Sequence, residues 1–290
     1  MKKNILHTKI IFPAIILFVG ILGGCTEREL SERPSDGPLK ICIKWPENTD
    51  VDGAHLLLYR SDGTLHADIK CEAAGHECRV PEDTYTILVS NSDCSNAECM
   101  NHELHYECCM CAKAHPTEEG VLQHVQNVYC IGEHGIEVKP GNRVCEVTLY
   151  PQNRVKYLHF DIDPTYVDDI QQMQLRMTGV VPSILLADGS DTQEETQHVL
   201  ANTSVMKNRH YVADMSVFGW RGQNLVTAEI TYTDGREEIS LPQDIGEQLT
   251  ALPKEGGTIN ITLELPSGGE ILLTVTVETW ENGTGSGTVI

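Results

Sequence analysis

Short alternations of apolar and polar residues recur along the chain and give its main structural signal. Leu39 to Trp45, Tyr85 to Ser90 and Cys145 to Leu149 each place an apolar residue at every second position. This period of two predicts β-strands with one buried face. Two more strands are expected at Ala54 to Arg60 and Leu65 to Ile69, because a Ser-Asp-Gly-Thr turn separates these apolar runs. The first half of the sequence is therefore predicted to be β-structure.

The second half shows the same alternation. Met173, Leu175 and Met177 occupy every second position of one run and are expected in a core. Asp234-Gly235 lies between two further runs and supplies the positive-φ residues that a tight hairpin turn needs. The expected elements are strands at 158–162 and 172–178, hairpins at 227–241 and 259–280, and one short helix at 244–252.

Regularly spaced short strands with almost no helix favour β-sandwiches over α/β units. The polar tripeptide Pro151-Gln152-Asn153 interrupts the alternation near the middle of the chain. We therefore expect an all-β protein of two tandem β-sandwiches. The N-terminal one spans 39–150 and the C-terminal one spans 154–290.

The first 25 residues have the organisation of a bacterial lipoprotein signal. Lys2 and Lys3 precede an apolar run from Ile10 to Leu22, and Leu22-Gly23-Gly24-Cys25 resembles a lipobox. The run is shorter than the ~20 residues that cross a bilayer as a helix. We expect residues 1–24 to be removed, Cys25 to carry the lipid, palmitate included, and residues 25–38 to act as a spacer.

Charge argues against a nucleic-acid partner. Three of the 21 basic residues lie in the predicted signal, which leaves 18 against 42 acidic residues, a formal charge of −24 for the mature chain. Such a surface repels phosphate backbones and anionic lipid headgroups. Membrane association is therefore expected through the N-terminal lipid alone.

Cysteine is confined to the first half of the mature chain. Ten cysteines follow Cys25, all between Cys42 and Cys145. Many of them crowd together with histidines in a stretch without clear strand or helix periodicity, which we expect to be a long loop. The candidate side chains there are Cys94, Cys99, His102, His105, Cys108, Cys109 and Cys111.

Three chemistries compete for this stretch, and mixed or free thiols are a further alternative. Export and an even number of thiols favour disulfides that staple the loop. Spacings such as Cys99-x-x-His102 and Cys108-x-x-Cys111 also suit zinc, although the donors are too many and too evenly spread to select four. A thioredoxin-like site is the weakest alternative, because no βαβ pattern surrounds the cysteines. The favoured hypothesis, disulfide bonding, involves no cofactor, and zinc is the alternative cofactor.

No sequence motif for catalysis is present: Gly-x-Ser-x-Gly, His-Glu-x-x-His, phosphate-loop and dinucleotide fingerprints are missing. His159, Asp161 and Asp163 share one strand face and are interpreted as the polar face of an edge strand. We therefore expect a protein that is not an enzyme. The candidate classes are a surface assembly protein, a surface glycan- or ligand-binding lipoprotein, and a metal-binding or redox module.

Several of these features together resemble a known family. The lipobox, the strand that ends in Trp45-Pro46, the Ser-Asp-Gly turn after Arg60 and the segment from Val80 to Asp93 are similar to the fimbrial anchor and accessory lipoproteins of the Bacteroidales. The C-terminal hairpin from Ile259 to Trp280 is similar too. The Cys/His stretch departs from the family pattern.

The resemblance implies two transthyretin-like β-sandwiches and a role in holding or regulating surface fimbriae in cell adhesion. It implies an outer-membrane location through the lipid on Cys25 and fimbrial subunits as partners. Strand addition at an open sheet edge is the expected mode of binding. The row Ile271, Leu273, Val275 and Val277 is the expected packing face of its strand, and the edge of that strand is the expected docking site.

Overall fold

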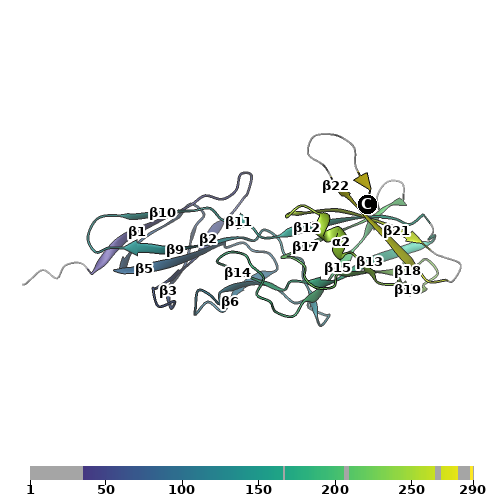
Figure 1. The fold of residues 1–290 in the computed structure, drawn as a ribbon, viewed down its shortest axis with the longest axis horizontal. Coiled ribbons are helices and arrows are strands. Elements are labelled where there is room, and N and C mark those ends of the chain that lie inside the picture. Colours follow the sequence, from purple (N-terminus) through teal and green to yellow (C-terminus); the bar gives the residue numbers. More distant parts are fainter. Residues whose placement is uncertain (1–34, 166, 206–208, 265–268, 280–287, 290) are drawn as a thin grey trace, which may run out of the picture.

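The protein is an elongated, almost entirely β-structured molecule (Figure 1). The structure is a computed structural model that describes residues 35–165, 167–205, 209–264, 269–279 and 288–289. The described residues form five sheets, which are arranged along the long axis from the N-terminal end to the C-terminal strands. The all-β class expected from the alternating pattern is confirmed.

Two sheets at the N-terminal end, which we call the N-terminal sheet pair, pack face to face. One has the strand order β10-β1-β4 and the other β11-β9-β5-β2-β3. Their strands are β1 (Asp36–Ile43), β2 (Gly53–Tyr59), β3 (Leu65–Glu72), β4 (Gly75–Pro81), β5 (Asp83–Asn91), β9 (Tyr129–Val138), β10 (Cys145–Leu149) and β11 (Gln152–Asn153).

One apolar core lies between these two sheets. Leu39, Ile41 and Ile43 of β1 are each less than 5% exposed, as their alternation predicts. They pack against Leu56 and Leu58 of β2 and the buried positions of β5. Strand β1 lies in the middle of its sheet, parallel to β10 and antiparallel to β4.

Two six-stranded sheets form the C-terminal sheet pair. Their orders are β16-β17-β12-β21-β22-β23 and β19-β18-β13-β15-β8, and β20 also pairs with β18. Their elements are β8 (Val121–Leu122), β12 (Lys156–Asp163), β13 (Ile170–Val180), β15 (Gln197–Asn202), β16 (Ser204–Val205), β17 (Tyr211–Val217), β18 (Leu225–Tyr232), β19 (Glu237–Ile239), β20 (Gln243–Asp244), α2 (Gly246–Ala251), β21 (Gly256–Glu264), β22 (Leu272–Thr279) and β23 (Thr288–Val289).

The core of the C-terminal sheet pair contains the predicted methionine stripe. Met173, Leu175 and Met177 are fully buried and pack against Phe160 from the facing sheet. Strand β12 lies between β17 and β21, so the interpretation of its polar residues as an edge-strand face was wrong. The outer face is nevertheless polar, because Asp161 pairs with His210 there.

A fifth sheet, with three strands, covers the outer face of the β5 sheet, and we call it the bridging sheet. It has the order β14-β7-β6 and contains β6 (Ala97–Met100), β7 (Cys109–Ala112) and β14 (Ser183–Leu185). Leu57, Leu88 and Cys130 project from the β5 sheet into a second core beneath it. As a result, β2 and β5 are buried on both faces.

The turns and the helix agree with the sequence expectations where the structure describes them. Gly235 has φ of 83° in the turn between β18 and β19. Helix α2 lies within the expected range, and Leu249 is its buried residue. Strands β4, β9, β15 and β17 were not expected. The stretch around the cysteines, expected to be a long loop, contains β6, β7 and β8, because backbone pairing with β14 and β15 organises it.

The predicted signal, Cys25, most of the spacer, Trp280 and the Gly-rich stretch 283–287 lie outside the described residues. Within the described ranges, no helix has the length and apolar character needed to cross a bilayer.

Candidate functional site

The predicted cysteines and histidines occupy one compact part of the fold, residues 94–115, which we call the Cys/His segment. Cys99 lies in β6, Cys109 and Cys111 lie in β7, and Cys108 directly precedes β7. Four residue pairs join the two strands, from Ala97 with Ala112 to Met100 with Cys109. The antiparallel pairing therefore brings cysteines from both ends of the intervening loop together.

The sulfur atoms form two close pairs. Cys99 Sγ lies 3.5 Å from Cys108 Sγ, and Cys109 Sγ lies 3.4 Å from Cys111 Sγ. All ten cysteines in the described part of the chain are free thiols in this structure. Cys94 makes separate contacts, since its thiol lies 3.2 Å from both the carbonyl and the side-chain oxygen of Asn91.

The thiols of each close pair have pKa values shifted in opposite directions. The hydrogen bond to Cys108 raises the pKa of Cys99, and the same contact lowers the pKa of Cys108. The contact with Cys111 likewise lowers the pKa of Cys109. Burial raises the pKa of Cys94 to about 12, so this thiol stays protonated at neutral pH. The close Cys99–Cys108 contact thus favours the Cys108 thiolate over the Cys99 thiolate.

The two predicted histidines lie in the loop between β6 and β7, and they do not face the sulfur pairs as a ligand set. The backbone carbonyl of His102 accepts a hydrogen bond from the Tyr59 hydroxyl at 3.0 Å. The ring of His105 packs edge-on against Tyr59, with centroids 5.9 Å apart, and against His134 at 5.7 Å. Its Nδ1 atom is buried without a hydrogen-bond partner.

Zinc binding finds no support in this arrangement. Across the described ranges, no group of three or more His, Cys, Asp or Glu side chains is placed to hold a metal ion. Tetrahedral zinc needs four converging donors. The cysteines instead form separate pairs, and the two histidines pack elsewhere.

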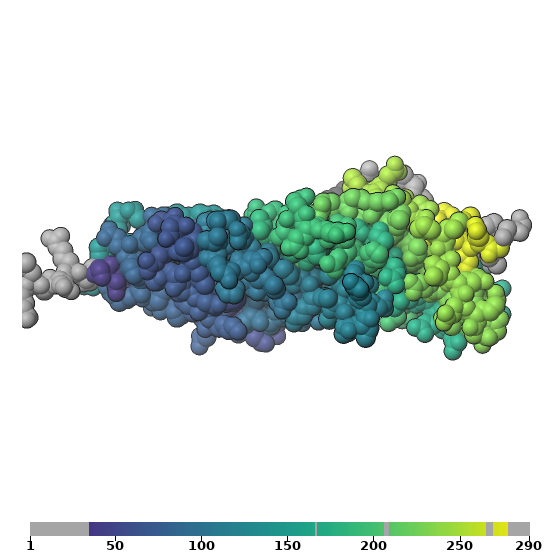
Figure 2. Space-filling model, turned by 90° about the horizontal axis from the view of Figure 1, so that it is seen from below, coloured from purple at the N-terminus to yellow at the C-terminus, as the bar shows by residue number. Residues whose placement is uncertain are grey.

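The Cys/His segment contacts the N-terminal sheet pair and residues of the C-terminal half of the chain. Toward the N-terminal pair, Leu65 N donates to Glu103 O at 3.2 Å and His105 N donates to Gly63 O at 3.4 Å. Toward the C-terminal half, β7 pairs with β14, and Leu186 N donates to Cys108 O at 2.9 Å. In the space-filling view, the blue-teal surface near residues 100–125 continues alongside the green C-terminal surface (Figure 2). The segment therefore forms part of the joint between the two halves.

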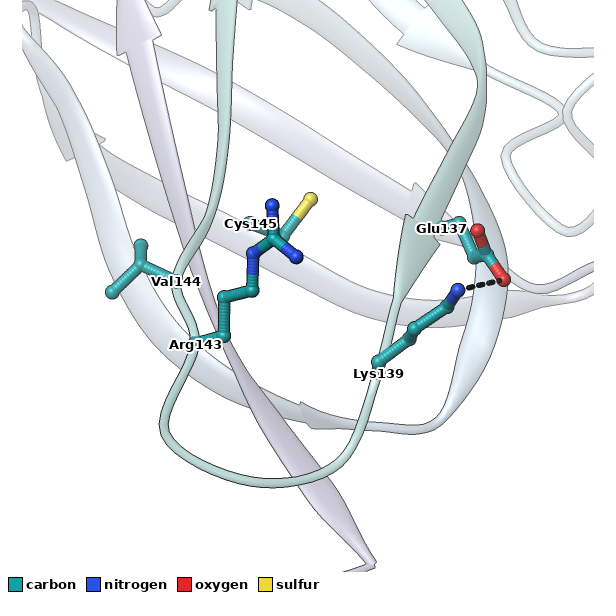
Figure 3. Close-up of a pocket in the computed structure, with 5 residues that line it drawn as sticks. All are labelled: Glu137, Lys139, Arg143, Val144 and Cys145. Carbon is teal, nitrogen blue, oxygen red and sulfur yellow. Dashed lines mark ion pairs between the residues drawn. The ribbon is translucent and has the colours of Figure 1, made fainter.

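A cleft of about 310 Å³ lies near the end of the N-terminal sheet pair where the described chain begins. It is lined by Glu137, Lys139, Arg143, Val144 and Cys145 (Figure 3). Lys139 pairs with Glu137 at 3.2 Å, on the opposite side of the connecting loop from Arg143 and Cys145. Residues of this loop also pack on the start of β1, where Gly141 N donates to Asp36 O at 3.2 Å.

The predicted docking edge lies on β22, in the C-terminal sheet pair. Ile271, Leu273 and Val277 are buried and Val275 is partly buried, so the expected packing face is confirmed. One side of β22 pairs with β21 along six residues. On the other side, β23 pairs only with Glu278 and Thr279, so 272–277 have no ladder partner among the described residues.

An aromatic group lies where the two halves of the chain meet. Trp45 and Tyr150 line one open cleft, and the Trp45 ring packs edge-on against Tyr129 at 6.4 Å. Tyr150 is 61% exposed and Tyr157 is 44% exposed. The alternating pattern did not indicate this group, because Trp45, Tyr129 and Tyr150 lie on separate strands or loops and come together only in the fold.

Comparison of the fold with solved structures finds similar proteins from the Bacteroidales. A candidate adhesin from Bacteroides ovatus superposes with a TM-score of 0.66 at 14% identity, covering 85% of this chain and 95% of that one. The fimbrial anchor protein Mfa2 from Porphyromonas gingivalis superposes with a TM-score of 0.59 at 13% identity, covering 85% and 98%. These likenesses show that the chain has the fold of such surface proteins.

A third solved structure has a similar fold. A candidate polysaccharide-binding protein from Bacteroides thetaiotaomicron superposes with a TM-score of 0.54 at 10% identity, covering 82% of this chain and 97% of that one. No protein-family model matches the sequence, and no curated protein matches it at the sequence level. The expected likeness to fimbrial anchor proteins is thus confirmed by the fold, and the three structures are described as adhesin, fimbrial and binding proteins.

Proposed function

We propose that this protein is a non-enzymatic anchor or accessory subunit of a surface filament, attached to the outer membrane by a lipid on Cys25. The observation that carries the proposal is the fold shared with the fimbrial anchor protein over 85% of the chain. The proposed partner is a fimbrial subunit. Its extended segment would add to an open sheet edge of this protein.

The position of β1 supports a role at the base of a filament. Strand β1 begins at Asp36, and the spacer from Cys25 to Ser35 would reach at most ~40 Å when fully extended. A lipid on Cys25 would therefore hold this end of the molecule close to the membrane. Because β1 pairs with both β10 and β4, the strand next to the tether is needed within its own sheet.

This arrangement would allow the protein to terminate a filament. An incoming strand cannot occupy the position of β1 while β1 is paired on both sides and tethered through the spacer. The other end of the molecule carries the open side of β22, where 272–277 have no ladder partner among the described residues. We infer that the first filament subunit docks there and that growth toward the membrane stops at this protein.

Lysine substitutions on β22 test this docking site. Thr274 is exposed on β22, and Thr276 lies on the same side of the strand. Lysines at these positions, as in Thr274→Lys with Thr276→Lys, protect an edge against strand addition. Ile239→Lys is the matched control, because Ile239 is 68% exposed on β19, the edge strand of the facing sheet. Each variant is purified from cells that assemble filaments, and the recovered subunits are identified.

The β22 variant should recover far less filament subunit than wild type, and the β19 control should match wild type. Equal recovery from both variants would place docking elsewhere. Deletion of the protein should change the length or retention of filaments. Failure of wild type to recover any filament subunit, together with unchanged filaments after deletion, would contradict the proposed function itself.

The aromatic group around Trp45 supports glycan binding as a second candidate function. Clefts lined by aromatic faces with a few polar groups suit ligands that have both apolar and hydroxyl surfaces. The test is binding of soluble polysaccharide by wild type and by Tyr150→Ala, with Tyr106→Ala as a control, because Tyr106 is 57% exposed in the Cys/His segment. Loss of binding confined to Tyr150→Ala supports this function, and no binding by wild type excludes it for the polysaccharides tested.

We also infer that the two sheet pairs are two transthyretin-like domains, 39–150 and 154–290. Their separate cores support this division. The Cys/His segment belongs to the first range by sequence, but its strand β7 pairs with β14 of the second range. The oxidising envelope proposed as the location also favours disulfides among the candidate cysteines.

A further inference from the structure

The Cys99 and Cys108 side chains share one face of the β6–β7 pair. Cys99 is directly opposite Met110, and Cys108 lies two residues before Met110, so all three project to the same side. That side packs into the core between the bridging sheet and the β5 sheet. Cys108 is fully buried, whereas Cys99 is only partly buried.

We propose that Cys99 and Cys108 form a disulfide that fixes the 99–108 loop across the joint between the two sheet pairs. Their sulfurs are 3.5 Å apart, so a shift of about 1.5 Å reaches the ~2.05 Å bond length. Bond formation joins Cys99 Sγ to Cys108 Sγ and breaks both S–H bonds. Two electrons and two protons pass to a disulfide-bonded exchange partner, which becomes a dithiol.

Closure proceeds by two exchange steps. One thiolate of the pair attacks the donor disulfide, forms a mixed disulfide and displaces the first donor thiolate. The other thiolate of the pair then attacks the sulfur held in the mixed disulfide and displaces the second donor thiolate. The donor leaves fully reduced and the loop closes.

The other close sulfur pair is unsuited to a bond despite its 3.4 Å separation. Cys109 and Cys111 alternate along one extended strand, where residues two apart are separated by ~6.6–6.8 Å and project in parallel. A disulfide needs Cβ atoms within ~3.5–4.5 Å. Bonding within this pair would distort β7, which pairs on both sides with β6 and β14.

The loop that this disulfide closes contains the contacts to the N-terminal sheet pair. The carbonyl groups of His102 and Glu103 accept hydrogen bonds from Tyr59 and Leu65, and Leu104 forms a bridge with Thr64. The β7 end of the same loop is paired with β14. A covalent link between the loop ends therefore makes detachment of one half from the other more costly.

Thiol counting on alanine variants tests the pairing in the full chain. Protein isolated from the cell envelope is denatured without reductant and alkylated. Its mass then gives the number of free thiols. The variants are Cys99→Ala, Cys108→Ala and the double variant, and Met110→Leu is the control for a perturbation on the same strand face. A second sample of each is first incubated with oxidised glutathione, in case the isolated protein is reduced.

In the oxidised state, each single variant should carry one more free thiol than wild type, and the double variant and Met110→Leu should equal wild type. Reduction of wild type should speed amide exchange in 99–108 by roughly tenfold or more, because closing a loop of this length is worth at least that factor. One fewer free thiol in both single variants shows that the two are unpaired and overturns the proposal. Opposite changes in the two single variants show a different partner and overturn it as well.

Discussion

The Tyr59 hydroxyl donates a hydrogen bond of 3.0 Å to the carbonyl oxygen of His102. Tyr59 ends β2 in the N-terminal sheet pair and is fully buried, and His102 lies in the loop of the Cys/His segment. Burial raises the pKa of Tyr59, so the hydroxyl remains a donor throughout the physiological range. This contact therefore attaches the Cys/His segment to the N-terminal sheet pair.

Tyr59→Phe should destabilise the protein by about 1 kcal/mol, because a hydrogen bond is lost and the His102 carbonyl loses its partner. It should also make 102–108 more accessible to protease. Tyr85→Phe is the matched control, since Tyr85 donates to Pro81 at 3.0 Å within the N-terminal sheet pair. Denaturant unfolding and limited proteolysis measure the two effects. Equal protection of the loop in both variants would contradict the attachment role.

Phe160→Ala should cost about 3–5 kcal/mol of stability, the usual range for emptying a fully buried aromatic site. Phe160 lies on central strand β12 and packs between the sheets of the C-terminal pair. The neighbouring His159→Ala is the control, because its side chain projects outward and forms an exposed pair with Asp214. The control should lose at most ~1 kcal/mol. Denaturant titration of both variants measures the difference, and similar losses would contradict the assigned faces of β12.

The strands with one buried face were the most predictable part of the fold. The Met173 to Met177 stripe and the Asp234-Gly235 turn depend on neighbours within a few residues, so the sequence alone indicated them. Strand β9 escaped prediction because Gly132 and Gly135 interrupt its alternation. Gly132 is required there, since a Cβ would lie 2.7 Å from Leu88 and 2.9 Å from Ala187.

The bridging sheet could not be predicted, because Met110 pairs with Ile184 across more than seventy residues. One signal for it was nevertheless present. Leu56, Leu57, Leu58 and Tyr59 form a continuous apolar run, which is typical of a strand buried on both faces. At the candidate site, the residue types were evident from the sequence. The close approach of the Cys99 and Cys108 sulfurs depends on the β6–β7 register, which the sequence did not reveal.

The Asp161–His210 pair should make stability depend on pH. Its 2.9 Å hydrogen bond raises the pKa of His210 above the usual value near 6.5. A raised folded-state pKa means that the contribution is fully present below about pH 6.5 and is lost as pH rises through the folded pKa. Asp161→Asn should therefore lower Tm at mildly acidic pH and have little effect at alkaline pH.

Thermal unfolding of wild type and Asp161→Asn across this range gives the comparison. Glu195→Gln is the charge control, because Glu195 is exposed and forms no ion pair within the described ranges. The control should show a difference from wild type that varies little with pH. A deficit for Asp161→Asn that grows toward alkaline pH would have the wrong sign and would contradict the assignment.

Cys25→Ala should release the protein from the membrane fraction, because the thiol is the only lipid attachment point proposed. Without the predicted signal, the chain has a formal charge of −24, so electrostatic attraction to anionic headgroups would not replace a lost lipid. Ser35→Ala, at the far end of the spacer, is the control and should remain in the membrane fraction. Fractionation after a high-salt wash, with mass measurement of the mature N-terminus, distinguishes the variants. A Cys25→Ala protein that still sediments with outer membranes after that wash would contradict lipid anchoring. In that case filaments should also stay attached to the cells that carry this variant.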